Sequence, residues 1–173
     1  MSVEFSILHL IQSLRTPVFD QVVLFITSLA NYVWYILIMG LLINKPTRKL
    51  GVVLVVAMIL QYLINGGILK HLFARVRPCN VDKTVELLVK RPKGFSFPSG
   101  HSAAAFCVVG VLYGAKIREL FWPALVLAIL IGFSRLYLYV HFPSDVLAGA
   151  FCGFAIGYVV WRAFVMLKKD EKV

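Results

Sequence analysis

The sequence predicts an all-α integral membrane protein: a bundle of about five transmembrane helices with an N-terminal amphipathic helix in the membrane interface. Hydrophobic residues make up 60% of the 173 residues, charged residues only 15%, and the mean hydropathy is +0.85. An average soluble domain is about half apolar and about a quarter charged, so this chain has too little polar surface for a soluble globule. Several stretches also reach the ~20 apolar residues that a spanning helix needs.

The first predicted element is a helix within residues 1–16. Its apolar side chains have near-helical spacing interrupted by Glu4 and His9, and it has no basic start or small-residue cleavage site. We therefore expect an interfacial helix rather than a signal peptide. Spanning helices are expected at Val22–Ile43, Leu50–Leu69, Ser102–Ala115, Phe121–Val140 and Val146–Leu167. Together they form one membrane-embedded domain, residues 1–173.

Two of these helices leave alternatives open. Asn31 interrupts Val22–Ile43, so Val18–Leu29 is alternatively a separate interfacial helix followed by a short span. Ser102–Ala115 is short and spans if it begins in a loop that dips into the bilayer.

The last predicted helix carries Gly149, Gly153 and Gly157 four residues apart. This small-residue face permits close helix packing, which we interpret as packing within one chain rather than dimerisation. The oligomeric state is left open.

The net charge of +10 suits contact with lipid phosphates, and nucleic acid is not an expected partner.

Five spans place Asn44–Lys49, Lys116–Leu120 and the C-terminal tail on one side of the membrane. The long loop Lys70–Gly100 and the tight turn Val140–Asp145 lie on the other. The positive-inside rule favours cytoplasmic short turns, although the long loop is also rich in Lys and Arg.

A first basic cluster runs from Lys70 to Pro78, where the second long span ends. Lys70 and Arg77 are seven residues apart, so both lie on one face if the helix continues to Pro78, which would then end it. The alternative interpretation is a basic helix end whose side chains reach the lipid headgroups.

A second cluster, Pro98-Ser99-Gly100-His101, opens the third span. Gly100 lets a ligand approach the backbone closely, and the free N–H groups of a helix start attract an anion. Ser99 adds a hydroxyl donor, and His101 stands beside the anion. The alternative is an ordinary helix cap, made by Ser99 or Ser102.

A third cluster runs from Ser134-Arg135 to His141 and Asp145. A charge such as that of Arg135 is costly at membrane depth and by default marks function. Asp145, four residues after His141, can hold the proton of one imidazole nitrogen and leave the other free to attack. The alternative is a helix-cap carboxylate beside an interfacial histidine.

Five spans bring all three clusters to one side, where their side chains suit a phosphate dianion. Lys70, Arg77 and Arg135 would neutralise it, and Ser99 and the Gly100 N–H would donate to it. His141 would attack phosphorus, supported by Asp145, and His101 would protonate the leaving oxygen. The cations do the work of a metal ion, and nearby carboxylates are few, so no metal or other cofactor is expected.

The three clusters resemble the signature of the type 2 phosphatidic acid phosphatase superfamily, the membrane lipid phosphate phosphatases. That signature reads K-x6-RP, PSGH and SR-x5-H-x3-D, and every element is present at the same spacing over roughly Leu50–Tyr158. The resemblance implies His141 as nucleophile, Asp145 as its partner and His101 as acid. It implies phosphate binding by Lys70, Arg77, Ser99, Gly100 and Arg135. It also implies a bacterial cytoplasmic membrane with the site on the extracytoplasmic face.

The expected function is therefore hydrolysis of the terminal phosphate of a membrane lipid through a phosphohistidine. The preferred substrate is undecaprenyl diphosphate. Phosphatidylglycerophosphate, phosphatidate and lipid A 1-phosphate are alternatives that the sequence does not separate well. A non-catalytic transport or resistance protein is disfavoured by the intact histidines and carboxylate. A vanadate-dependent haloperoxidase, whose site is similar, is disfavoured by the apolar spans.

Overall fold

A computed structural model describes residues 3–30 and 32–170, and every regular element in that part of the chain is helical. In chain order these elements are α1 (Val3–Gln12), α2 (Pro17–Ala30), α3 (Val33–Ile43), α4 (Arg48–Gln61), the π-helix η1 (Tyr62–Leu69), α5 (Lys70–Phe73), α6 (Pro78–Val81), α7 (Gly100–Ala115), α8 (Arg118–Tyr137) and α9 (Pro143–Asp170).

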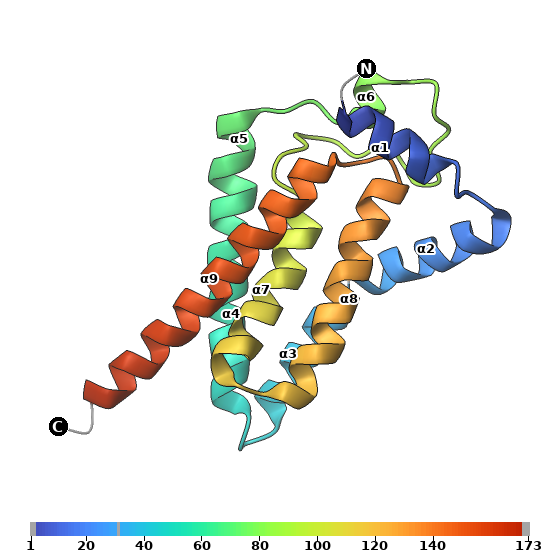
Figure 1. Ribbon diagram of the computed structural model, residues 1–173. Coiled ribbons are helices and arrows are strands. Elements are labelled where there is room, and N and C mark those ends of the chain that lie inside the picture. The colour runs from blue at the N-terminus through green and yellow to red at the C-terminus, as the bar shows by residue number, and fades with distance from the viewer. Residues whose placement is uncertain (1–2, 31, 171–173) are drawn as a thin grey trace.

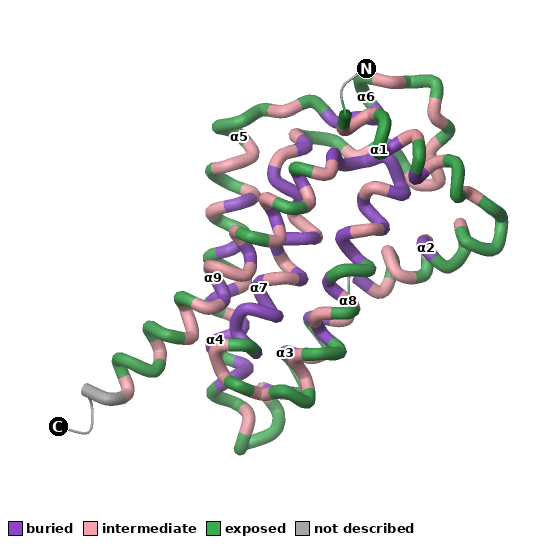
Figure 2. The backbone as a smooth tube through the Cα atoms, viewed as in Figure 1, coloured by how far each residue is buried: buried purple, intermediate pink, exposed green. Residues whose placement is uncertain are grey.

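Helix α7 forms the centre of the bundle and packs against α4, α8 and α9 (Figure 1). Its middle turns are fully buried, including Val108 and Leu112 (Figure 2). The contact with α9 depends on small residues: a Cβ added at Gly153 would overlap the carbonyl oxygen of Ala103, and one at Gly157 that of Cys107. The glycine face of α9 therefore packs within the chain, as predicted.

Within residues 3–30 and 32–170, four helical stretches are long and apolar enough to cross a membrane: Pro17–Ile43, Arg48–Val81, Arg118–Tyr137 and Pro143–Lys168. Helix α7, with 16 residues, is shorter. The all-helical membrane class is thus confirmed, while the count of five spans stays a prediction.

The first long apolar stretch is divided into two helices, α2 and α3, and α2 runs across the direction of α8 (Figure 1). This division matches the alternative of a separate helix before a short span. Asn31, on which that alternative rested, lies outside the described residues.

The expectation of one helix continuing from Lys70 to Pro78 is wrong. The helix ends at Phe73, and Ala74 adopts a left-handed conformation with φ of 43°. Arg77 is extended, with ψ of 149°, because a following proline disfavours helical geometry at the preceding residue. Pro78 instead begins α6, as prolines commonly begin helices. Arg77 therefore reaches the site from a loop.

The N-terminal helix α1 lies across the end of the bundle at which α8 ends and α9 begins (Figure 1). The predicted helix is present, and its depth in the membrane stays a prediction. It shares this end of the molecule with α6 and with the long loop.

Candidate active site

The predicted site residues gather at one end of the bundle. Lys70 begins α5, the second cluster begins α7, Arg135 lies in the last turn of α8, and Asp145 lies in the first turn of α9. These helix ends face the same side (Figure 1). Lys70, Gly100 and His101 line one cavity, and the guanidinium of Arg77 lies 3.1 Å from Nε2 of His141. The three motifs are therefore brought together.

His141 lies between α8 and α9 and is only 3% exposed. Its Nε2 is 3.1 Å from Nη1 of Arg77. A guanidinium can only donate, so Nε2 accepts this hydrogen bond and the proton of the neutral imidazole sits on Nδ1. Burial, together with the charge of Arg77, lowers the pKa of His141 to about 4. The imidazole is thus neutral at pH 7, with the Nε2 lone pair directed at the cationic cluster.

Asp145 is fully buried beside the Nδ1 face of His141. Its Oδ2 is 3.6 Å from Nδ1, which is longer than a hydrogen bond. The hydroxyl of Ser96 lies beside both groups: it donates to Oδ2 of Asp145 and is 3.4 Å from Nδ1 of His141. The backbone N–H of Phe142 also donates to Oδ2, at 2.8 Å. Asp145 is thus held rigidly next to the imidazole, with Ser96 bridging the pair.

The three predicted phosphate-binding cations are buried or half-buried and are held mainly by neutral acceptors. Lys70 Nζ donates to the carbonyl of Phe95 at 2.9 Å, and Arg77 Nε donates to that of Gly94 at 3.1 Å. Arg135 donates to the hydroxyls of Ser134 and Thr27. Buried charges without carboxylate partners are unfavourable unless an anion joins them, so this cluster is suited to binding an anion.

The second motif supplies the start of α7. Ser99 is its N-cap, with Oγ accepting from the N–H of Ser102 at 3.4 Å, so the capping role is present. A Cβ at Gly100 would meet no protein atom within 4 Å. The space beside the Cα of Gly100, at the start of α7, is therefore open.

Two residues at the site were missed by sequence reasoning. Ser96 precedes the second motif by two positions, and no pattern marks it as a partner of Asp145. Arg75 lies within the first cluster, but only its neighbours Lys70 and Arg77 were given roles. Its Nη1 donates to Oδ1 of Asp145 at 2.7 Å.

The arrangement combines a neutral buried imidazole, a fixed carboxylate, a second histidine and clustered cations. Such a site can bind a phosphate group, attack it with nitrogen and stabilise charge on its oxygens. Among the described residues, no group of three or more His, Cys, Asp or Glu is placed to hold a metal ion.

Comparison with known proteins agrees with this geometry. Residues 50–169 match the PAP2 superfamily. The chain is 33% identical over 129 residues, 75% of its length, to a protein of Sulfolobus acidocaldarius named undecaprenyl-diphosphatase, and it spans 62% of the length of that relative.

Two crystal structures share the fold at 30% sequence identity. Aquifex aeolicus LpxE matches with a TM-score of 0.81, over 94% of this chain and 96% of that one. A transmembrane PAP2 type phosphatidylglycerolphosphate phosphatase from Bacillus subtilis matches with a TM-score of 0.69, over 97% and 84%. The resemblance drawn from the three motifs is therefore confirmed, and the chain belongs to the PAP2 superfamily.

Proposed function

We propose that the chain is a membrane lipid phosphatase that removes a terminal phosphate through a phosphohistidine at His141. Membership of the PAP2 superfamily makes a lipid phosphatase the class of enzyme. The specific roles below are supported by the geometry of the site.

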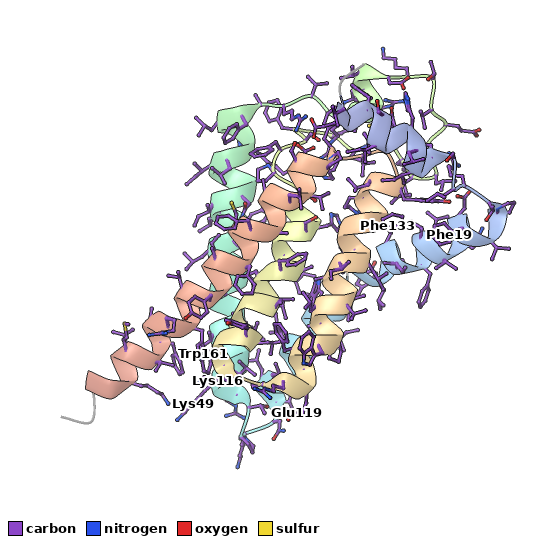
Figure 3. The ribbon with its side chains drawn as sticks, viewed as in Figure 1. Phe19, Lys49, Lys116, Glu119, Phe133 and Trp161 are labelled. Atoms are coloured by element: carbon purple, nitrogen blue, oxygen red, sulfur yellow. The ribbon has the colours of Figure 1, made fainter. Side chains whose placement is uncertain are left out.

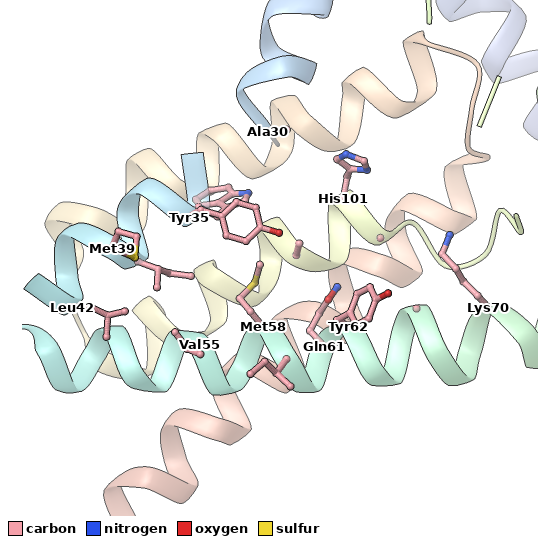
Figure 4. A pocket seen from close by; sticks show the side chains of 16 residues that line it. Ala30, Tyr35, Met39, Leu42, Val55, Met58, Gln61, Tyr62, Lys70 and His101 are labelled. Carbon is pink, nitrogen blue, oxygen red and sulfur yellow. The ribbon is translucent and has the colours of Figure 1, made fainter. Parts of the chain in front are cut away.

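The observation that carries the proposal is an apolar groove whose lining includes Lys70 of the cationic cluster and His101. The groove lies between α3, α4 with η1, and α7, and has a volume of about 690 Å³ (Figure 4). Trp34, Met39 and Met58 are among its apolar lining residues. Lys70 and His101 line its polar end. A lipid phosphate has this same division, with an apolar tail and an anionic head.

The first chemical step transfers the phosphoryl group to the protein. Nε2 of His141 attacks phosphorus in line, while Lys70, Arg77 and Arg135 hold the equatorial oxygens. The bond from phosphorus to the lipid oxygen breaks, and His101 protonates that oxygen. Asp145 stabilises the positive charge that develops on the imidazole.

The second step regenerates the enzyme. His101, now neutral, removes a proton from water, which attacks the phosphohistidine and breaks the N–P bond. Inorganic phosphate leaves, and His141 is neutral again. Ser99 and the N–H of Gly100 donate to the phosphoryl oxygens in both steps. The clustered cations supply the electrostatic stabilisation, so the reaction is proposed to need no metal.

Undecaprenyl diphosphate is the proposed substrate, because the relative from Sulfolobus acidocaldarius is named for it. Phosphatidylglycerophosphate is the second candidate, because one structural neighbour is a phosphatidylglycerolphosphate phosphatase. Phosphatidate and lipid A 1-phosphate stay as further alternatives, since the groove accepts any apolar tail.

We propose the extracytoplasmic face of a bacterial cytoplasmic membrane for the site. Lys49 and Lys116 lie at the far end of the molecule from α1 (Figure 3). Basic turns of this kind favour the cytoplasm, and this supports an extracytoplasmic position for the opposite end, which carries the proposed active site.

The test is phosphate release by the purified protein in detergent, with EDTA and no added metal. Undecaprenyl diphosphate, phosphatidylglycerophosphate and phosphatidate are offered side by side, with His141→Ala as the control. Release that is abolished in the variant supports the proposal, and the preferred lipid identifies the substrate. Well-folded protein that releases no phosphate from any lipid would overturn it in favour of a non-catalytic role.

Added vanadate separates the phosphatase from the other enzyme class with a similar site. Vanadate should inhibit a phosphatase, whereas peroxidase activity after its addition would indicate a haloperoxidase.

A further inference from the structure

Helix α1 is attached by one face to the turn that carries His141. Glu4 Oε1 accepts hydrogen bonds from the N–H and the hydroxyl of Ser144, at 3.1 and 2.7 Å. The ring of Phe5 packs edge-on against Phe142, with centroids 5.2 Å apart. Further along the helix, the hydroxyl of Tyr139 is 2.9 Å from Nε2 of His9. An N-terminal helix thus contacts the residues on both sides of the proposed nucleophile.

The opposite face of α1 is apolar and exposed. Val3, Ile7 and Leu10 follow helical spacing and have exposed fractions of 76, 39 and 69%. Such a face is suited to the membrane interface, with the polar face turned towards the protein.

Arg75 connects α1 to the carboxylate beside the nucleophile. Its Nη2 is 2.5 Å from Oε2 of Glu4, and its Nη1 is 2.7 Å from Oδ1 of Asp145 and 2.6 Å from Oγ of Ser144. Its guanidinium carbon lies 4.0 Å from the ring centroid of Phe142. Two carboxylates therefore share one guanidinium.

The two oxygens of Asp145 have separate partners. Oδ2 accepts from Ser96 and from the N–H of Phe142, and lies nearest to His141. Oδ1 accepts from Arg75. The Arg75 contact therefore fixes the second oxygen of the carboxylate whose Oδ2 lies beside Nδ1.

We propose that Arg75 is a positioning residue for Asp145 and through it for His141, and that Glu4 holds Arg75, so that α1 completes the active site. This inference rests on the proposed phosphohistidine chemistry. Arg75 touches neither the phosphate nor the leaving group in this role. The charge-assisted contacts of Glu4 also keep it ionised: burial opposes its charge, but the hydrogen bonds from Ser144 and Arg75 lower its pKa below the usual value.

The test compares Glu4→Gln, Arg75→Gln, Arg75→Lys and the double variant Glu4→Gln/Arg75→Gln with the wild-type enzyme. Glu119→Gln is the matched control for a lost carboxylate, because Glu119 lies at the opposite end of the molecule (Figure 3). Steady-state kcat and KM are measured on the preferred lipid, together with the rate of phosphoenzyme formation and the midpoint of thermal unfolding.

Arg75→Gln is expected to lower kcat and the rate of phosphoenzyme formation by about 10- to 100-fold, the range for a lost charge-assisted hydrogen bond. KM should change by less than about threefold, because substrate binding is not involved. Arg75→Lys should restore part of the loss. The double variant should be no slower than Arg75→Gln, because Glu4 acts through Arg75.

Three results would overturn the inference. An increase in KM at unchanged kcat would make Arg75 a substrate ligand. Losses of activity that follow only a lowered unfolding midpoint would make the contact merely structural. Additive effects of the two substitutions would remove the link through Glu4. If the wild-type protein releases no phosphate, the proposed function is wrong and the inference loses its basis. If the wild-type enzyme is active and the variants react at the same rate, only the inference is wrong.

Discussion

Replacing Gly153 by alanine should weaken the contact between α7 and α9. The added Cβ would overlap the carbonyl oxygen of Ala103 and approach its Cα, and backbone atoms cannot rotate away as a side chain can. Overpacking of this kind costs about 1–3 kcal/mol, and a backbone obstacle places the cost near the upper end. Alanine in a helix regains roughly 0.5–1 kcal/mol over glycine. The net loss of unfolding free energy is then about 2 kcal/mol.

Gly40→Ala is the matched control, since a Cβ at Gly40 meets nothing within 4 Å. Thermal unfolding in detergent should show a midpoint about 4–8 °C lower for Gly153→Ala, and an unchanged or slightly higher midpoint for Gly40→Ala. Activity should fall with Gly153→Ala as well, because α7 carries His101 and α9 carries Asp145. If both variants unfold and react like the wild type, the close helix contact does not support the site as argued.

Three further predictions concern the site and its attachment. Burial lowers the pKa of His141 to about 4, so its neutral, nucleophilic form predominates above that pH. The titration of His141 should therefore leave kcat/KM constant above about pH 5 and lower it tenfold per pH unit below pH 4. A loss of kcat/KM that begins near pH 6.5 would contradict the burial argument. Ser96→Ala removes a donor to Asp145 and should lower kcat by about tenfold with little change in KM, whereas wild-type kinetics would show that the bridge is unimportant. Tyr139→Phe removes a hydroxyl that donates to Asp82 at 3.0 Å and lies 2.9 Å from Nε2 of His9 in α1, and it should lower the unfolding midpoint by about 2–6 °C. An unchanged midpoint would mean that α1 is held by its other contacts.

Much of this arrangement is predictable from sequence because the signals are local. Apolar length predicts the helices, and the glycine spacing of α9 predicts a close helix contact. The spacing from Arg135 to His141 and Asp145 predicts that a helix end, a turn and a helix start bring a cation, an imidazole and a carboxylate together. Each conclusion uses residues within a few turns of one another.

The parts that were missed depend on contacts between distant segments. The helix that ends at Phe73 rather than at Pro78 shows how a left-handed residue, Ala74, overrides an apparently continuous pattern. Glu4 looks like any polar residue of an interfacial helix. Only the fold brings it into contact with Ser144, which is 140 residues away in the sequence. Ser96 likewise gains its partner from α9, which no local spacing reveals.

The most direct test of the central claim is to trap the phosphoryl-enzyme. The protein is mixed with its preferred lipid carrying a labelled terminal phosphate, quenched within one turnover, and analysed for label by peptide mapping. The account predicts label on His141, stable in base and lost in acid as expected for an N–P bond, and absent from His141→Ala. Continued turnover in His141→Ala, or label on another residue, would contradict it.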